Sequence, residues 1–288
     1  MKKNTVDSLQ FSFEAVAKNM LSIVSDKPTN RVTICKSPLR YPGGKSKAVN
    51  TVLDLLPQGL DVLVSPFIGG GSIELAAASK LGIKVYGYDA FKPVVKFWQA
   101  VIEDSEMTAE KVRQYYPLSR TKFYTLQSRF FNMKDKVEVA AAFFVLNRAS
   151  FSGTTLSGGM SPGHPRFTES SIGRLKNFNI DGLQVKYADF KDSMKKHKDD
   201  FLYLDPPYAN GGNLYGSRGD HHIGFDHEGL AHLLCKRQRW ILSYNDCSKI
   251  RELYKDYQMI EPKWTYGMST NKQSKELLIL SNDFTRVS

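Results

Sequence analysis

The sequence is poor in cysteine and has no long apolar run. Only three of its 288 residues are cysteine, and no two of them have the spacing of a zinc site or a redox pair. This usage is typical of a reducing compartment, so the sequence predicts an intracellular, cytoplasmic protein. No apolar run approaches the length of a membrane span, and the N-terminus lacks the apolar core of a signal peptide. We therefore expect neither a disulfide framework nor a membrane partner.

Acidic residues are the minority charge. Lysine and arginine number 40 against 29 aspartates and glutamates, which gives a net charge of +11. A basic surface gains affinity for polyanions by releasing counterions from phosphates, so the excess favours a nucleic-acid partner, although a charge that serves only solubility is the alternative. The length allows one large α/β domain with an insertion or two modest domains.

Several motifs of other protein classes are missing. The segment 43–45 is too short in its glycine spacing for a phosphate-binding P-loop, and Glu74 stands where a dinucleotide-binding fingerprint has its third glycine. No Pro-Cys pair occurs, which argues against chemistry that starts from a cysteine thiolate. His221, His222 and His227 match no zinc signature, so no metal is expected.

One short stretch combines a buried strand with a polar end. Residues 201–204 are apolar and predict a strand, which Pro206 and Pro207 end because proline cannot donate to a ladder. A carboxylate, Asp205, and an aromatic ring, Tyr208, lie just beyond. Ligands bind at the carboxyl ends of strands in open α/β sheets, so these residues are the first candidates for a functional site. A strand-ending turn with a capping Asp is the structural alternative.

A strand, a glycine-rich loop and a helix occur earlier in the chain. Residues 61–65 predict a buried strand, and the loop 66–72 leads into a helix. The next strand ends at Asp89, about 20 residues beyond Gly69, where a carboxylate is placed to accept hydrogen bonds from a ribose. This combination predicts a nucleoside ligand that has no pyrophosphate.

The alternation of strands and helices is interrupted over 96–184. Helical patterns there are followed by the Gly- and Ser-rich stretch 150–165, and such stretches are usually functional loops. Arg148, Phe151 and Arg166 flank or begin this stretch, so they are the candidates for contacting nucleic acid.

After the insertion the alternation resumes. Two further strands end near Asp189 and Asn245, and the last two predict an antiparallel hairpin at the sheet edge. Because parallel strands end at one edge of a sheet, we expect Asp89, Asp189, Asp205 and Asn245 to face one crevice. The glycine-rich segment 209–224 is predicted to be a lid that closes after binding.

These motifs and their order resemble the Dam-type, alpha-group DNA adenine-N6 methyltransferases. The resemblance rests on Leu39–Lys45, the loop 66–72 and Asp205–Tyr208, and covers residues 36 to 282. It implies an α/β fold with a Rossmann-like methyltransferase sheet, mostly parallel with a C-terminal antiparallel hairpin, plus a helical insertion. The implied organisation is an N-terminal helix and linker over 1–35, a catalytic domain over 36–95 and 185–288, and a target-recognition domain over 96–184.

The resemblance also implies roles for individual residues. The catalytic tetrapeptide would be Asp205, Pro206, Pro207 and Tyr208. The S-adenosyl-L-methionine site would be formed by Tyr41, Gly43, Gly44, Lys45, Phe67, Gly69, Gly71, Ser72, Asp89, Asp189 and Asp205. Tyr41 stands where many members of the family have Trp.

The implied reaction is methyl transfer from S-adenosylmethionine to N6 of an adenine flipped out of double-stranded DNA. Asp205 and the Pro206 carbonyl would accept hydrogen bonds from the two N–H groups of the amine, and Tyr208 would stack on the base. Catalysis would therefore come from positioning of the reactants plus electrostatics. The resemblance also allows a bacterial or viral origin and a cognate restriction endonuclease that acts separately. The alternatives are an RNA adenine-N6 methyltransferase and a non-catalytic nucleic-acid-binding protein with a vestigial cofactor pocket.

Overall fold

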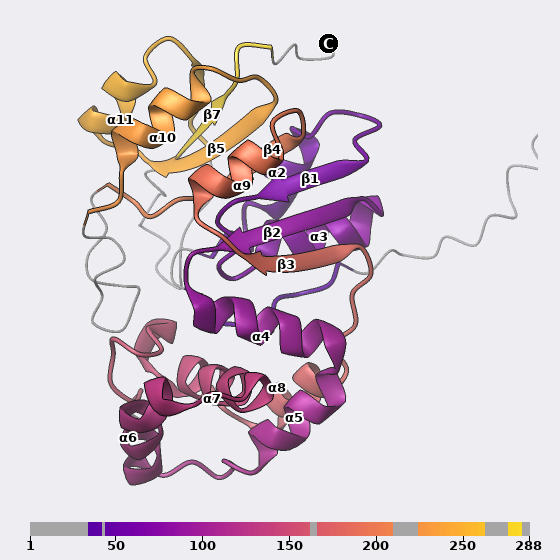
Figure 1. Ribbon diagram of the computed structural model, residues 1–288, viewed down its shortest axis with the longest axis vertical. Coiled ribbons are helices and arrows are strands. Elements are labelled where there is room, and N and C mark those ends of the chain that lie inside the picture. The colour runs from indigo at the N-terminus through magenta and orange to yellow at the C-terminus, as the bar shows by residue number, and fades with distance from the viewer. Residues whose placement is uncertain (1–33, 42–43, 162–165, 210–223, 263–275, 284–288) are drawn as a thin grey trace, which may run out of the picture. The chain divides into compact units, whose positions relative to one another are not determined.

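A computed structural model of the chain describes residues 34–41, 44–161, 166–209, 224–262 and 276–283. Within these residues the chain forms one α/β unit around a seven-stranded sheet (Figure 1). The helix expected within 1–35, Gly43, His221 and His222 with most of the expected lid, and most of the connection between the last two strands lie outside the described residues.

The sheet has the strand order β3-β2-β1-β4-β5-β7-β6. Its first five strands in this order pair in parallel, and they are β1 (Val62–Ser65), β2 (Lys84–Asp89), β3 (Leu183–Tyr187), β4 (Phe201–Leu204) and β5 (Trp240–Asn245). Strand β7 (Glu276–Leu280) runs antiparallel to both β5 and β6 (Gln258–Ile260). The predicted mostly parallel sheet with an antiparallel C-terminal hairpin is confirmed.

Strand β4 shows why the central strands read as continuous apolar runs. All four of its residues are buried, and they alternate between two hydrophobic clusters, with Phe201 and Tyr203 in one and Leu202 and Leu204 in the other. A parallel strand that is covered on both faces needs apolar side chains at every position.

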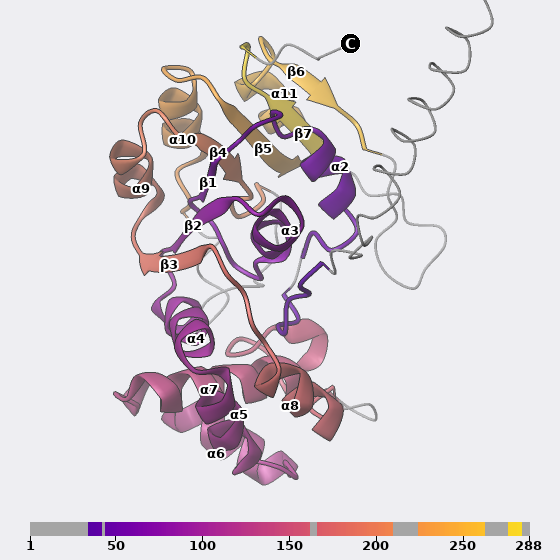
Figure 2. The same cartoon turned by 90° about the vertical axis from the view of Figure 1, so that its right-hand side faces the viewer.

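Helices cover both faces of the sheet (Figure 2). The first cluster includes residues of α2 (Val49–Asp54) and α3 (Ser72–Leu81). The second includes residues of α9 (Phe190–Lys196), α10 (His227–Leu234) and α11 (Ser248–Leu253).

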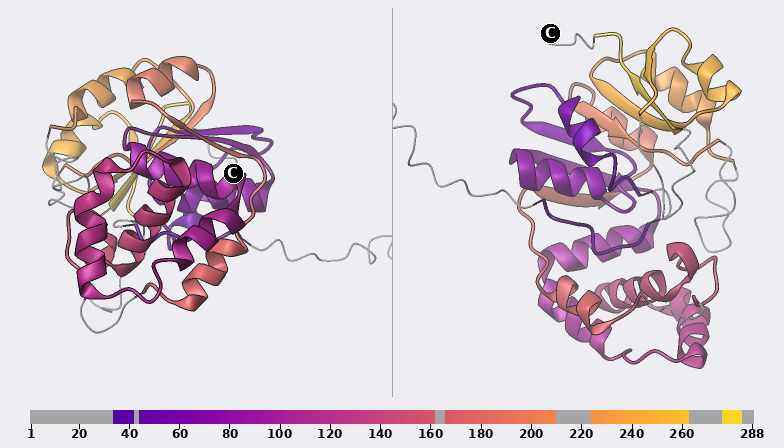
Figure 3. Two further views of the ribbon diagram at one scale, coloured as in Figure 1. Left: turned by 60° about the horizontal axis from the view of Figure 1, so that its bottom comes forward. Right: turned by 180° about the vertical axis from the view of Figure 1, so that it is seen from behind.

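The helical insertion between β2 and β3 shares the first cluster. Its members are α4 (Lys92–Glu103), α5 (Ser105–Arg113), α6 (Arg120–Arg129), α7 (Lys136–Ala149) and α8 (Glu169–Lys176). Helix α4 lies between the sheet and α7, as the front and rear views show (Figures 1 and 3). The division into domains stays a prediction, and its boundaries at 96 and 185 fall inside α4 and β3.

Phenylalanine side chains join α4 to α7. Phe97 stacks on Phe144 with ring centroids 6.1 Å apart, and Phe143 lies 6.0 Å from Phe97. Phe143 and Phe144 are both fully buried, as expected for a helix core. Helix α7 is buried nearly all round, which is the pattern of a central helix rather than of a surface helix.

Gly71 should tolerate a side chain less well than Gly82. Both cap α3 with a positive φ, 68° at Gly71 and 67° at Gly82, but a Cβ on Gly71 would lie 2.8 Å from Trp98, whereas nothing lies within 4 Å at Gly82. Gly82→Ala should cost about 1–2 kcal/mol of unfolding free energy for its left-handed backbone alone. Gly71→Ala should cost at least about 1 kcal/mol more, because an overpacked core is strained. Equal losses in urea unfolding would contradict this packing.

Candidate functional site

The candidate site lies where the strand order of the sheet reverses. Strand β2 pairs with one side of β1 and β4 with the other, and Val64 of β1 is in register with Leu202 of β4. Diverging connections leave a crevice at the carboxyl ends of two such strands. Ser65, the last residue of β1, and Asp205, the residue after β4, both lie at this edge.

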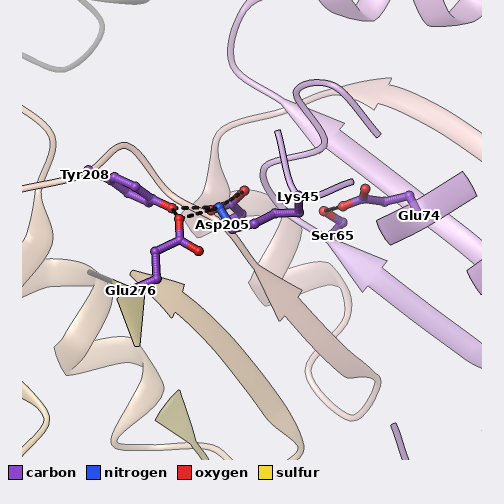
Figure 4. Close-up of polar contacts among 6 residues, drawn as sticks. All are labelled: Lys45, Ser65, Glu74, Asp205, Tyr208 and Glu276. Atoms are coloured by element: carbon purple, nitrogen blue, oxygen red, sulfur yellow. Dashed lines mark hydrogen bonds and ion pairs between the residues drawn. The ribbon is translucent and has the colours of Figure 1, made fainter. Parts of the chain in front are cut away.

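Lys45 is the centre of a compact polar cluster (Figure 4). Its Nζ donates to Asp205 Oδ1 at 2.7 Å, to Asp205 Oδ2 at 2.9 Å and to the Tyr208 hydroxyl at 2.7 Å. Glu276 Oε1 lies 3.4 Å from Nζ and accepts a hydrogen bond from the Tyr208 hydroxyl. Lys45 is only 3% exposed, so the two carboxylates compensate a charge that is removed from water. We call Lys45, Asp205, Tyr208 and Glu276 the lysine cluster.

Residues 205–208 form no regular structure, and neighbouring strands hold their far end. The Asn245 Oδ1, at the end of β5, accepts from the Ala209 backbone N–H at 2.9 Å. The Tyr208 ring lies 6.4 Å from the ring of Tyr244. The prolines therefore end the ladder, and β5 fixes where the chain goes next.

Two carboxyl groups near the edge have shifted pKa values. Burial raises the pKa of Asp205 to about 6, against the opposing effect of Lys45 and with a smaller upward contribution from Glu276. Burial also raises the pKa of Glu74 to about 7, although the Ser65 hydroxyl donates to its Oε1 at 2.6 Å. Burial therefore favours the protonated form of both carboxyl groups, and of Glu74 more strongly than of Asp205.

The glycine loop is held close to Tyr41 and to the end of β2. A Cβ on Gly69 or Gly70 would come within 2.9 Å or 2.6 Å of the Tyr41 side chain. The Asp89 Oδ2 accepts from Gly69 N at 3.0 Å, and its Oδ1 accepts from Phe91 N at 2.8 Å. Only glycine allows this approach, so the loop backbone and the Asp89 carboxylate form one surface that could receive a nucleoside.

Two other predicted cofactor residues, Phe67 and Ser72, belong to this loop, and a third, Asp189, follows β3. Phe67 stacks on Phe190 at a centroid distance of 5.7 Å, and Ser72 is the first residue of α3. Asp189 precedes Phe190 and caps α9 by accepting from Lys191 N at 2.8 Å. The structure thus brings Lys45, Asp205 and Tyr208 into direct contact, whereas Asp189 follows the edge strand β3 and contacts none of them in the described residues.

Sequence reasoning missed Glu276, Glu74 and Ser65. Glu276 is the first residue of β7, and because β7 is antiparallel to β5, its first residue lies at the edge where the parallel strands end. A glutamate that begins the apolar run 277–280 was the available signal. Glu74 and Ser65 had no signal beyond their closeness to the glycine loop.

Four arginines gather where the segment before Lys45 meets the insertion. The Arg148 Nε donates to the Arg166 carbonyl at 3.1 Å, and its Nη1 to the Pro38 carbonyl at 3.5 Å. Burial, together with the nearby charges of Arg174, Arg40 and Arg166, lowers the pKa of Arg148 to about 10. We call Arg40, Arg148, Arg166 and Arg174 the arginine cluster.

Within the residues that the structure describes, no carboxylate forms an ion pair with the arginine cluster. In the described part of the chain, the arginine ion pairs are those of Arg113 and Arg251, which lie outside the cluster. Phe151, at the start of a short 3-10 helix over Phe151–Gly153, is 61% exposed. Gly153 approaches the Arg40 carbonyl so closely that a Cβ there would lie 2.1 Å from it. An exposed ring and unpaired cations are therefore presented by adjacent segments.

Comparison with known proteins identifies the family. Residues 41–268 match the family model of D12 class N6 adenine-specific DNA methyltransferases, which is well over half of the chain. The chain belongs to this family. The resemblance seen in the sequence is thereby confirmed, and the protein is an adenine-specific DNA methyltransferase with a Rossmann-like methyltransferase fold.

Three curated relatives of the methyltransferase match it at low sequence identity. Modification methylase StsI of Streptococcus sanguinis is 27% identical over 67% of this chain, and the match spans only 33% of StsI. The Type II methyltransferase M1.LlaDCHI of Lactococcus lactis subsp. cremoris is 23% identical over 85% of this chain and 94% of the relative. M.CviBI, a Type II methyltransferase of Paramecium bursaria Chlorella virus NC1A, is 21% identical over 84% of this chain and 96% of the relative.

Two further observations concern only the described residues of the methyltransferase. No helix there is both long and apolar enough to cross a membrane. No group of three or more His, Cys, Asp and Glu side chains in that part of the chain is arranged to hold a metal ion.

Glu74 should make the stability of the methyltransferase depend on pH. Its folded pKa of about 7 lies above the roughly 4.3 of an unfolded chain, so the folded state holds a proton that the unfolded state releases in between. The stability from this group is therefore present at low pH and is lost as pH rises through about 7. Glu74→Gln should gain thermal stability relative to wild type between about pH 5 and pH 8. Glu110→Gln, on the exposed face of α5, is the control, and parallel melting curves for all three proteins would refute the assignment.

Proposed function

We propose that the enzyme transfers a methyl group from S-adenosylmethionine to N6 of an adenine flipped out of double-stranded DNA. The observation that carries the proposal is the lysine cluster, in which Asp205 lies at the end of a central strand with Pro206, Pro207 and Tyr208 behind it. Membership of the family supports adenine as the base. The donor and the flipped base are our inference.

The donor site would be formed by the glycine loop and the residues around it. Tyr41, whose carbonyl accepts from Gly44 N, packs against Gly69 and Gly70 of the loop that holds Phe67 and Ser72. Asp89 accepts from Gly69 N and would offer its carboxylate oxygens to the ribose hydroxyls. Gly43, Gly71 and Asp189 complete the proposed site by position in the sequence. When bound, S-adenosylmethionine would supply an electrophilic methyl group on a sulfonium centre.

The protein's own contribution to the reaction is to position and polarise the amine. The exocyclic amine of adenine is a weak nucleophile because its lone pair is delocalised into the ring. Ionised Asp205 and the Pro206 carbonyl can accept hydrogen bonds from its two N–H groups and favour a tetrahedral geometry at the nitrogen. Tyr208 can stack on the base. Because an ionised carboxylate is a stronger acceptor than a protonated carboxyl group, the rate should rise with pH through the Asp205 pKa of about 6.

DNA would be held by the helical insertion, which we propose as the target-recognition domain. Arg148, Arg166 and Phe151 were the candidates from the sequence, and Arg40 and Arg174 join them in space. Guanidinium groups that pair with no carboxylate in the described part of the chain, next to an exposed ring, suit a phosphodiester backbone with a nearby unstacked base. The flipped adenine would then reach Asp205 from this side.

An RNA substrate has to be distinguished from a DNA substrate by experiment. RNA would offer the same phosphates and adenine, so methylation of duplex DNA and of structured RNA should be compared directly.

Two of the relatives are named Type II methyltransferases. We propose that this enzyme likewise acts inside the cell beside a separate restriction endonuclease. Protection of methylated plasmid from cleavage by that endonuclease would test the proposal.

Loss of Asp205 should abolish methylation without unfolding the protein. Glu276 stays near Lys45 and continues to compensate its charge, so Asp205→Ala should fold and bind S-adenosylmethionine. The rate of single-turnover methylation of an adenine-containing duplex should fall by at least about 10²–10³-fold. Mapping of the modified bases identifies the product. Asp205→Asn keeps the shape but is a weaker acceptor, and should also lose most of the rate. A rate close to wild type for Asp205→Ala would refute this centre.

Removal of exposed arginines in the cluster should weaken DNA binding uniformly across sequences. Arg166→Ala or Arg174→Ala should each lower the salt dependence of binding, log Kd against log salt, by about 1. Arg113→Ala is the matched control, because Arg113 is exposed on the same insertion but is paired with Glu169 at 2.8 Å. An Arg113 effect equal to those of Arg166 and Arg174 would place the DNA elsewhere.

A further inference from the structure

Lys45 lies between two carboxylates and contacts them unequally. Both Asp205 oxygens accept from its Nζ, at 2.7 Å and 2.9 Å, while Glu276 Oε1 lies 3.4 Å away (Figure 4). Glu276 is 5% exposed and accepts from the Tyr208 hydroxyl, so it is held in place on the other side of the ammonium.

This arrangement conflicts with the role proposed for Asp205. An ammonium that bonds to both carboxylate oxygens draws electron density from them and makes them weaker acceptors for a neutral amine. The target amine and Lys45 therefore compete for Asp205, whose side chain is 23% exposed and can be reached from the crevice. Asp205 becomes a stronger acceptor for the amine when Lys45 gives up at least one of its two bonds to the carboxylate.

We infer that Glu276 is a positioning residue that receives the Lys45 ammonium when the target amine takes its place on Asp205. The inference rests on the proposed function, because it needs an amine at Asp205. No covalent bond forms or breaks in this exchange, since one hydrogen bond of a charged group is replaced by another.

The geometry suits such an exchange. The Lys45–Glu276 contact need only shorten from 3.4 Å to the roughly 2.8 Å of a charge-assisted hydrogen bond. Glu276 is fixed by β7, where it is in register with Asn245 of β5. The lysine cluster keeps two carboxylates and one ammonium in either arrangement, so no ion has to leave a buried site unpaired.

The exchange also changes the basicity of Asp205. The titratable groups around Asp205 come from five elements or loops, and they are Lys45, Glu74, Tyr208, Tyr244 and Glu276. Glu276 raises the pKa of Asp205 and Lys45 lowers it. Without the Glu276 charge, Lys45 stays on Asp205 and the pKa of Asp205 falls.

Single-turnover methylation with saturating DNA and S-adenosylmethionine, measured across pH, tests the inference. Glu276→Gln should retain donor affinity within about twofold but lose at least about tenfold in rate, less than a group that touches the reacting atoms. The acid limb of its pH–rate profile should move to lower pH. Glu276→Asp keeps the charge, so its acid limb should stay near that of wild type. Glu252→Gln, an exposed carboxylate paired with Lys255, should change neither quantity.

Each contrary result has a definite meaning. A Glu276→Gln enzyme with the wild-type rate, or with a reduced rate and an unmoved acid limb, would overturn the inference while leaving the proposed function in place. If Glu276→Gln does not fold by circular dichroism, Glu276→Asp decides: a charge-retaining variant with a shifted acid limb would overturn the inference. A wild-type enzyme that methylates no adenine would overturn the proposed function itself.

Discussion

The ion pair between buried Lys45 and partly exposed Asp205 is the constraint on which the edge of the sheet depends. It joins the segment before α2 to the end of β4, 160 residues away in the chain. Removing one partner of a buried pair typically costs about 3–5 kcal/mol, because the remaining charge is stranded in a poor solvent. In this enzyme Glu276 and the Tyr208 hydroxyl also contact the Lys45 ammonium, so the charge of Lys45 is compensated from more than one strand.

A second constraint acts at the glycine loop, and it is steric rather than electrostatic. Tyr41 packs against Gly69 and Gly70, while the Asp89 carboxylate ties the loop to the start of α4. Lys45 and Tyr41 belong to the same short segment, so one stretch of chain supports both the proposed donor site and the proposed catalytic centre. Tyr41 and Lys45 therefore position the two proposed sites together at the edge that the strands supply.

Much of this could be predicted from the sequence, and the failures share one cause. Periodicity and proline punctuation predicted the strands, and the four-residue run Asp205–Tyr208 predicted the candidate centre. Glu276 and the Ser65–Glu74 pair could not be predicted, because their importance comes from contacts between distant segments. Arg40 and Arg174 were missed for the same reason, since each looks like an ordinary surface charge until the fold brings it close to Arg148. The structure also showed that α4 belongs to both the sheet layer and the insertion, which a boundary drawn through residue 96 had divided.

Asn147 has a consequence for any attempt to exchange the helical insertion between relatives. Fully buried at the end of α7, it accepts from Arg40 N and donates to the Arg40 carbonyl, both at 2.8 Å, and also donates to Thr155 Oγ1 at 3.1 Å. A chimera cut at the two chain crossings of the insertion would import a new α7 but keep the old segment at Arg40. The amide would then bond correctly only if the Arg40 backbone kept the same position, so the insertion and residues 38–41 form one discontinuous structural unit.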